Sequence, residues 1–183
     1  MNRVVLVRHG DAAAHWSEHA DPGLSELGQA QARHLAVSLA PLGPLPVFTS
    51  PMRRCRETAA PLAESWGVTA IVEPRVSEIE APDHDVATRG PWLSEVLSKT
   101  WPELPAAQQA WRDGVVECLL ALDKPCVVVT HFVAINAAIG AATVDDRVVC
   151  HRVGNCTTTM LETDGTSLMV VALPAEPDTT EVR

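Results

Sequence analysis

Short apolar runs alternate with longer amphipathic stretches along this chain. The runs are rich in β-branched residues and end abruptly at a charged residue, as in the opening segment "VVLVRHG". Consecutive β-branched residues suit a strand that is covered on both faces of a sheet. The stretches between the runs repeat apolar residues every three or four positions, which predicts helices. The alternation predicts an α/β fold, a three-layer α/β/α sandwich with a mainly parallel central sheet.

The predicted elements run from a first strand to a final hairpin. Strands are expected at 4–7, 45–50, 68–74 and 125–131, with helices at 21–42, 51–67 and 132–140. A hairpin is expected around Asp164 and Gly165. We expect a single domain, 1–173, followed by a loose C-terminal tail at 174–183.

Residues with special backbone preferences mark the ends of the predicted helices. Ser25 is suited to cap the first helix, and Pro51 and Gly67 bracket the second. Pro61 lies inside the second helix, where we expect a kink or a break because proline lacks a backbone donor. Gly140 is expected to end the helix at 132–140.

The stretch 79–124 differs from the rest of the chain. It is rich in proline and tryptophan and carries two amphipathic helical patterns, at 86–99 and 105–122. We interpret it as an inserted helical cap segment that packs over one edge of the sheet. Its tryptophans either dock the segment onto the sheet or line a substrate pocket.

Composition and charge exclude some function classes. The formal net charge is −9, and non-specific nucleic-acid binding needs a basic surface, so we expect no nucleic-acid partner. An anionic ligand would have to be held by a local positive pocket. The five cysteines form no C-x-x-C pair and no secretory signal precedes the first strand, which favours free thiols and a cytoplasmic location.

The most apolar stretch, 126–144, is interpreted as a buried strand that leads into a buried helix. A membrane span would place His131 and Asn136 in lipid, where polar side chains are costly. We therefore expect no membrane association. The sequence leaves the oligomeric state open, and a homodimer is compatible with it.

Cationic and imidazole side chains recur at the ends of the predicted strands. The first strand ends at Arg8 and His9, the second leads to Arg53 and Arg54, and the fourth ends at His131. In open α/β sheets, ligands bind at the carboxyl ends of the strands. These groups would therefore meet at one edge of the sheet, where they favour an anionic ligand.

The same residues resemble a known family. "LVRHG", "DPGLSELGQAQA", "TSPMRRCRETA", "VSEIE" and "VVTHF" occur in the order and approximate spacing of the histidine phosphatase superfamily. The resemblance is to its phosphoglycerate-mutase-like branch and is weakest in the tryptophan-rich segment. The acid phosphatases and phytases are disfavoured, because they usually carry Arg and Pro shortly after R-H-G and this chain has "DAAA" there.

The resemblance implies roles for five residues. His9 would be the nucleophile that forms a phosphohistidine, and Arg8, Arg54 and His131 would hold the phosphoryl oxygens without a metal or cofactor. Arg53 would be a solvated helix residue. Glu78 matches the family's general acid, with Glu80 as the rival two residues on.

Departures from the family pattern lie around the expected phosphoryl site. The positions that often carry Ser or Thr and then Asn hold Ala12 and His15, and Phe132 follows His131 where Gly is common. Candidate substrate contacts are His15, Trp16 and Arg89, with His84 as a further candidate. A metal site built on His15 and His19 lacks a third ligand at suitable spacing.

The sequence thus favours a metal-independent phosphomonoesterase that acts on a small phosphorylated metabolite. A phosphohistidine protein phosphatase and a non-catalytic phosphate-binding module are the alternatives. A phosphoglycerate mutase is disfavoured, because a mutase usually has more cap and basic residues with which to hold its phosphodonor.

Overall fold

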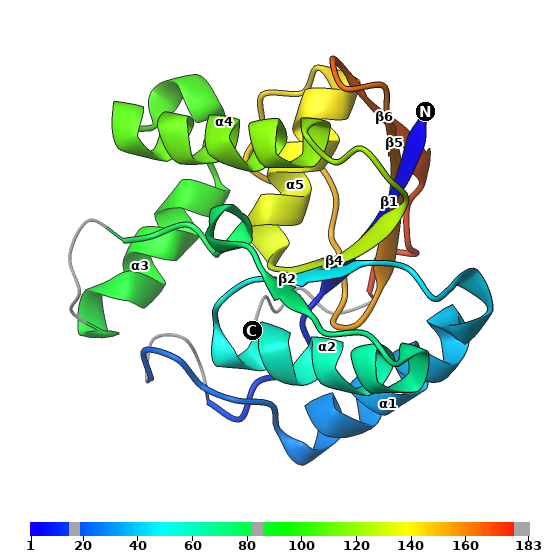
Figure 1. The fold of residues 1–183 in the computed structure, drawn as a ribbon. Coiled ribbons are helices and arrows are strands. Elements are labelled where there is room, and N and C mark those ends of the chain that lie inside the picture. Colours follow the sequence, from blue (N-terminus) through cyan, green and yellow to red (C-terminus); the bar gives the residue numbers. More distant parts are fainter. Residues whose placement is uncertain (15–18, 82–85, 178–183) are drawn as a thin grey trace.

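A six-stranded sheet forms the centre of the computed structural model, which describes residues 1–14, 19–81 and 86–177, with only the backbone for 86 and 87. The strand order is β3-β2-β4-β1-β5-β6 (Figure 1). The strands are β1 (Asn2–Arg8), β2 (Val47–Thr49), β3 (Ile71–Val72), β4 (Cys126–Thr130), β5 (Thr158–Thr163) and β6 (Leu168–Ala172). The first four are parallel, and the β5–β6 hairpin joins β1 antiparallel.

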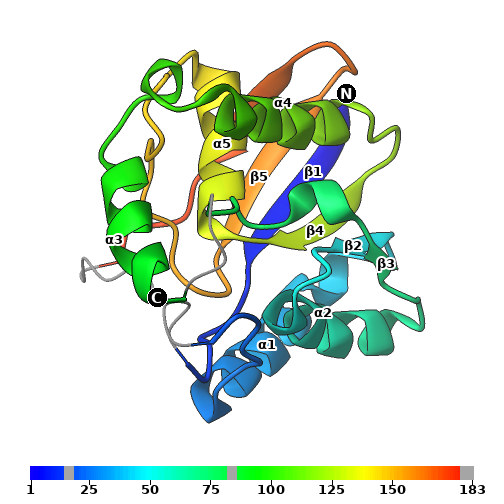
Figure 2. The ribbon, with the colours of Figure 1, turned by 90° about the vertical axis from the view of Figure 1, so that its left-hand side faces the viewer.

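Helices cover both faces of this sheet, which confirms the predicted α/β sandwich (Figures 1 and 2). The α-helices are α1 (Glu26–Leu39), α2 (Arg53–Trp66), α3 (Val86–Leu97), α4 (Ala106–Leu120) and α5 (Phe132–Thr143). Short 3₁₀ turns lie at η1 (Ala40–Leu42), η2 (Pro74–Val76) and η3 (Trp101–Glu103). One face of the sheet packs against α1 and α2, and the other against α4 and α5.

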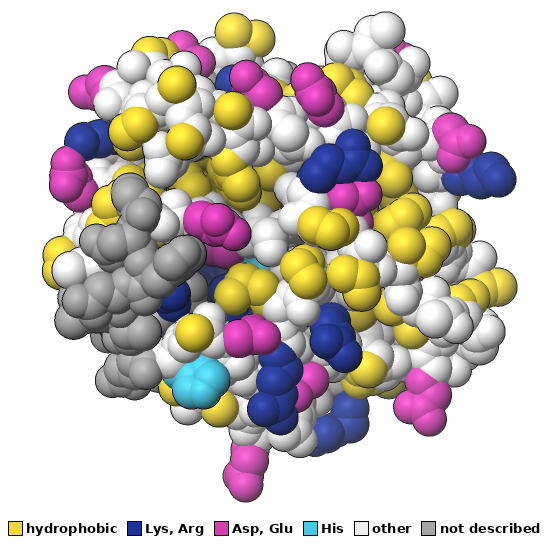
Figure 3. All heavy atoms as spheres, turned by 60° about the vertical axis from the view of Figure 1, so that its left-hand side comes forward, with side chains coloured by type: hydrophobic (Ala, Val, Ile, Leu, Met, Phe, Trp, Pro, Cys, Tyr) yellow, Lys and Arg dark blue, Asp and Glu magenta, His cyan; other side chains and the backbone are white. Residues whose placement is uncertain are grey.

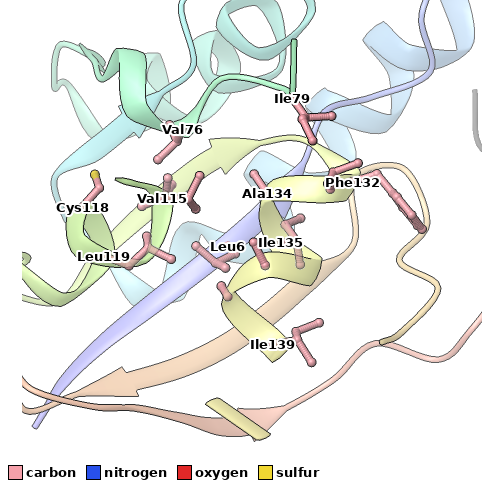
Figure 4. Packing of buried hydrophobic residues seen from close by; sticks show 14 of the residues in the cluster. Leu6, Val76, Ile79, Val115, Cys118, Leu119, Phe132, Ala134, Ile135 and Ile139 are labelled. Carbon is pink, nitrogen blue, oxygen red and sulfur yellow. The ribbon is translucent and has the colours of Figure 1, made fainter. Parts of the chain in front are cut away.

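Alternate side chains of β1 enter two separate cores. Val5 and Val7 belong to the cluster under α1 and α2, whereas Val4 and Leu6 belong to the cluster under α5. Figure 4 shows Leu6 among the side chains of α4 and α5. All four are at most 1% exposed, so a strand at the centre of the sheet needs apolar residues at every position.

The ends of α1 and α2 follow the sequence signals, but the interior of α2 does not. The Ser25 hydroxyl caps α1 by accepting from the Gly28 N–H, and α2 ends at Gly67, which has a φ of 64°. Pro61 does not divide the helix, because α2 runs unbroken from Arg53 to Trp66, so the predicted break is wrong and the kink stays a prediction. Proline costs one backbone hydrogen bond there, and burial of the neighbouring Leu62 and Ala63 offsets that cost.

Helix α5 also departs from the prediction at its C-terminal end. It continues past Gly140 to Thr143. Gly140 lacks a side chain because the chain returns against it: a Cβ there would lie 2.6 Å from the Asp145 carbonyl oxygen and 3.2 Å from Cys150 Sγ. The glycine therefore permits a close approach and does not end the helix.

The two helices predicted between residues 79 and 124 are present as α3 and α4. Helix α4 packs with α5 on one face of the sheet, and the placement of the whole segment as a cap over one edge stays a prediction. Val115 and Leu119 of α4 lie in the same buried cluster as β1, β4 and α5, and Trp101 is 2% exposed and stacks on Trp111. These two tryptophans dock the segment, which completes one helical layer.

The first residues of the predicted tail are attached to the domain. The Pro174 carbonyl oxygen lies 2.8 Å from His151 Nε2, and the Glu176 carboxylate accepts from the Arg152 N–H at 2.9 Å. Pro174 and Glu176 are thus hydrogen-bonded to the domain, residues 178–183 lie outside the described part, and the looseness of the tail stays a prediction.

Two further expectations concern the cysteines and the membrane. All five cysteines are free thiols, as predicted. In the described part of the chain, no helix combines the length and the apolar character that a membrane crossing requires.

Two glycines bring α1 against the turn that follows β1. A Cβ on Gly28 would lie 2.1 Å from the Asp11 carbonyl oxygen, and one on Gly10 would lie 2.8 Å from the Gly28 carbonyl oxygen. Backbone meets backbone here, so neither side can give way cheaply. This contact fixes the course of the chain on leaving β1.

Replacing Gly28 with alanine should destabilise the fold by about 1–3 kcal/mol, the usual range for overpacking. Gly114 in α4 is the control, because a Cβ there meets nothing within 4 Å. Gly114→Ala should stabilise the helix by about 0.5–1 kcal/mol. Urea unfolding of both variants measures the difference, and an unchanged Gly28→Ala would contradict the close approach.

Candidate functional site

The carboxyl ends of three neighbouring parallel strands bring the sequence-predicted residues together. Arg8 ends β1 and is followed by His9, Thr130 ends β4 and is followed by His131, and Thr49 ends β2 four residues before Arg53, the first residue of α2. The predicted nucleophile His9 and the three residues expected to hold the phosphoryl oxygens, here called the cage (Arg8, Arg54 and His131), are all buried. Arg8, His9 and Arg54 are 3–4% exposed, and His131 is 0% exposed. The parallel register of β1 and β4, in which Arg8 pairs with Thr130, brings these strand ends side by side.

His9 is held so that one ring nitrogen is a proton donor and the other an acceptor. Its Nδ1 lies 2.8 Å from the Gly10 carbonyl oxygen, which can only accept, so Nδ1 carries the proton. Nε2 then has a lone pair and accepts from Arg54 Nε at 3.1 Å. Burial, with the charges of Arg54 and Arg8, lowers the pKa of His9 well below its usual 6.5, so the ring is neutral at pH 7.

Arg54 connects the two histidines. Besides its bond to His9, its Nη2 lies 3.1 Å from His131 Nδ1. Its Nη1 is buried and has no hydrogen-bond acceptor among the described residues. Such a donor is costly unless a ligand oxygen supplies the acceptor.

Arg8 is fixed by a late segment of the chain. Its Nη1 donates to the Val153 carbonyl oxygen at 2.8 Å, and its guanidinium lies over the Phe132 ring, 5.3 Å from the centroid. Burial lowers the pKa of Arg8 to about 10, which still leaves a cation at neutral pH.

The carboxyl group of this site comes from Glu78, just after η2. Its Oε1 accepts from the Ile79 N–H at 3.1 Å. Burial raises its pKa, although the charges of Arg54 and Arg8 act in the opposite direction. The rival, Glu80, is exposed.

The molecular surface is hollowed on this side. Figure 3 shows basic, acidic and histidine side chains together in a hollow beside the atoms drawn in grey. A buried, neutral imidazole lone pair and two guanidinium groups in one place form a site for an anion that can react with a nucleophile.

The other predicted residues are placed less completely. Arg53 is exposed and ion-paired with Glu57 at 2.7 Å, which fits its predicted place outside the cage. Arg89 lies half-buried in α3. His15, Trp16 and His84 lie outside the described residues.

Sequence reasoning missed three supporting residues. Ser50 Oγ lies 2.8 Å from His131 Nε2, Thr58 Oγ1 accepts from the Gly10 N–H at 2.9 Å, and Asn155 Nδ2 donates to the His9 carbonyl oxygen at 2.9 Å. Ser50 and Thr58 stand in the motif "SPMRRCRET", whose spacing from Arg54 could have indicated them. Asn155 follows no such pattern.

Metal ions in proteins are held by groups of His, Cys, Asp or Glu side chains. Within residues 1–14, 19–81 and 86–177, no three His, Cys, Asp or Glu side chains are grouped as ligands for a metal ion.

Sequence relatives cover part of this chain. A glucosyl-3-phosphoglycerate phosphatase of Mycobacterium tuberculosis is 30% identical over 115 residues, 61% of this chain and 48% of that protein. Phosphoserine phosphatase 1 of Hydrogenobacter thermophilus is 30% identical over 115 residues, 61% of this chain and 51% of that protein. The matched stretch is thus about half the length of these relatives.

A solved structure and a family profile extend over nearly the whole chain. A mycobacterial glucosyl-3-phosphoglycerate phosphatase, solved as a complex with VO3, superposes with a TM-score of 0.72 at 26% identity, covering 96% of this chain and 100% of that one. The profile of the histidine phosphatase superfamily (branch 1) matches residues 4–175. With its fold and its R-H-G strand end, this chain belongs to the histidine phosphatase superfamily, branch 1.

Proposed function

We propose that this protein is a metal-independent phosphomonoesterase that acts on a small phosphorylated metabolite through a phosphohistidine at His9. The observation that carries this proposal is the neutral His9 ring, with its Nε2 lone pair directed at the buried guanidinium of Arg54. That arrangement suits a nucleophile beside an anion-binding group.

Binding would begin with the phosphoryl oxygens at the two arginines. Arg54 has a buried donor to offer at Nη1, and Arg8 is held by the Val153 carbonyl. As Arg54 turns its donors to the phosphoryl group, it would release the His9 Nε2 lone pair to which its Nε donates.

Phosphoryl transfer would follow in one displacement. The His9 Nε2 lone pair forms a bond to phosphorus, the bond to the ester oxygen breaks, and Glu78 donates its proton to that oxygen. The Gly10 carbonyl accepts from Nδ1 and so favours the positive charge that the ring acquires. The raised pKa of Glu78 favours the protonated form that this step requires.

Hydrolysis would restore the enzyme. Glu78, now a carboxylate, accepts a proton from water while the water oxygen attacks phosphorus. The nitrogen–phosphorus bond breaks, its electron pair returns to Nε2, and inorganic phosphate leaves.

The substrate class rests on similarity. The relatives are named as phosphatases of glucosyl-3-phosphoglycerate and phosphoserine, both small phosphate esters. Because of Ala12 and Phe132 in the phosphoryl surroundings, we do not transfer either substrate to this chain. A cytoplasmic location and a homodimer stay predictions.

Replacing His9 with alanine should abolish hydrolysis of an activated aryl phosphate in the presence of excess chelator. We expect a loss of more than about a thousandfold, since the covalent route disappears. Wild-type activity that needs an added metal would contradict the proposal. Wild-type binding of phosphate without turnover would favour the non-catalytic module, and turnover of phosphohistidine peptides alone would favour the protein phosphatase.

Arg54→Ala should weaken competitive inhibition by inorganic phosphate by about tenfold to a hundredfold, as for loss of a hydrogen bond to a charged group. Arg53→Ala is the matched control on the neighbouring residue. It should leave the inhibition constant nearly unchanged, because Arg53 is exposed and paired with Glu57. Equal effects of the two changes would remove Arg54 from the proposed cage.

Glu78→Gln should slow alkyl phosphates by about 10²–10⁴-fold and activated aryl phosphates far less, because only the alkoxide needs a proton. Alkyl hydrolysis by the wild type should fall as the pH rises through the raised pKa of Glu78, and this limb should vanish in the variant. On the acidic side of the pH–rate profile, the loss of activity should lie well below pH 6.5, because the lowered pKa of His9 keeps its ring neutral down to lower pH. Glu80→Gln is the control, and if it alone lost alkyl activity the acid would be Glu80.

A further inference from the structure

The two ring nitrogens of His131 have different neighbours. Nδ1 lies 3.1 Å from Arg54 Nη2, and Nε2 lies 2.8 Å from the Ser50 hydroxyl. A guanidinium can only donate, so Nδ1 accepts. In this geometry the proton of the neutral ring is therefore on Nε2, where it is donated to Ser50 Oγ.

This tautomer does not suit a bound phosphoryl group. Nδ1 is the nitrogen that faces the arginine cage, and a phosphoryl oxygen accepts hydrogen bonds, so His131 contributes only if Nδ1 bears a proton. A second proton on the ring is disfavoured, because burial together with Arg54, His9 and Arg8 lowers the pKa of His131 well below 6.5. A neutral ring protonated on Nδ1 can donate to the phosphoryl oxygen without a second proton.

That second tautomer needs a donor opposite Nε2. A serine hydroxyl both accepts and donates, so Ser50 can serve either state by turning its hydrogen. Its oxygen is held in place by the Met52 N–H at 3.2 Å, and the residue is 0% exposed. Ser50 therefore keeps its position while its hydrogen-bonding role reverses.

We propose that Ser50 is a positioning residue that sets the tautomer of His131. It accepts from Nε2 while Nδ1 is bonded to Arg54 and donates to Nε2 when a phosphoryl group is bound, which leaves Nδ1–H for the phosphoryl oxygen. The ring gives one proton to solvent from Nε2 and takes one from solvent at Nδ1, so its charge stays zero. This proposal rests on the proposed function, because it assigns a part in phosphoryl binding.

Cys55 is the other group opposite Nε2. Its Sγ lies 3.3 Å from that nitrogen and 3.5 Å from the Thr130 carbonyl oxygen. Burial raises the pKa of the thiol, so it stays protonated, and a thiol is a weak donor. The His9 ring meets the His131 ring edge to face, with the ring centroids 5.2 Å apart. Ser50 is thus the stronger partner of Nε2.

Nitrogen-15 spectra of the histidines in the full-length wild type test the tautomer directly. Without ligand, His131 should show a protonated Nε2 and an unprotonated Nδ1. Saturating inorganic phosphate should reverse the two signals. An unchanged ring, or a ring protonated on both nitrogens, would overturn the proposal.

Three variants test whether the Ser50 hydroxyl causes the reversal of the His131 tautomer. Ser50→Ala should lower kcat/KM by about tenfold to a hundredfold, the range for a lost bond that orients a histidine, and should abolish the reversal. Ser50→Cys keeps the size and a weak donor, so it should recover part of both and remains informative if the alanine variant fails to fold. Cys55→Ala should retain the reversal, and its loss there would transfer the role to the thiol.

Ser65→Ala is the matched control, because this serine of α2 bonds only to the Leu62 carbonyl among its described partners. It should leave turnover and the spectra unchanged. If the wild type is active and the Ser50→Ala variant has the same kcat/KM, the role of Ser50 is refuted but the proposed function is not. A wild type that neither binds phosphate nor hydrolyses esters would refute the proposed function, and this inference with it.

Discussion

Two guanidinium groups lie buried beside two imidazoles, and the surrounding structure has to hold these cations close together. Burial and mutual repulsion act against them, as the lowered pKa of Arg8 indicates. Backbone carbonyls and neutral ring nitrogens supply acceptors, and Glu78 is the carboxyl group near both arginines. An anion bound here would relieve the repulsion, so the same arrangement that costs stability favours ligand binding.

The sheet makes this arrangement possible. Parallel pairing of β1 with β4 and of β4 with β2 brings three strand ends into line. The contact between Gly10 and Gly28 and the bond from the Gly10 N–H to Thr58 fix the first connection against both helices below it. Side chains on separate segments are thereby kept in register.

The sequence allows much of this to be predicted, because strands buried on both faces need apolar runs and the charges at their ends stand out. Residues 4–7 and 126–129 are of this kind. The preference for Glu78 over Glu80 rests on the family motif alone, since the partial burial of Glu78 and the exposure of Glu80 depend on the path of an irregular segment. The predictions of a break at Pro61 and of a helix end at Gly140 failed for a related reason. The local backbone preferences of these two residues are weaker than the packing of the helices around them. Val153 contributes only its carbonyl oxygen, which no residue type reveals.

The loop between α5 and β5 has a consequence for how the site comes into being. Its Val153 carbonyl orients Arg8, Asn155 bonds to the His9 carbonyl, and the Cys156 N–H donates to the Arg8 carbonyl. The reactive strand is therefore secured by residues more than a hundred positions further along the chain. A chain truncated before this loop would keep most of the reactive side chains but would lack the hydrogen bonds that orient them. Assembly of the site is thus coupled to completion of the whole sheet, so a half-formed intermediate would have no ordered nucleophile.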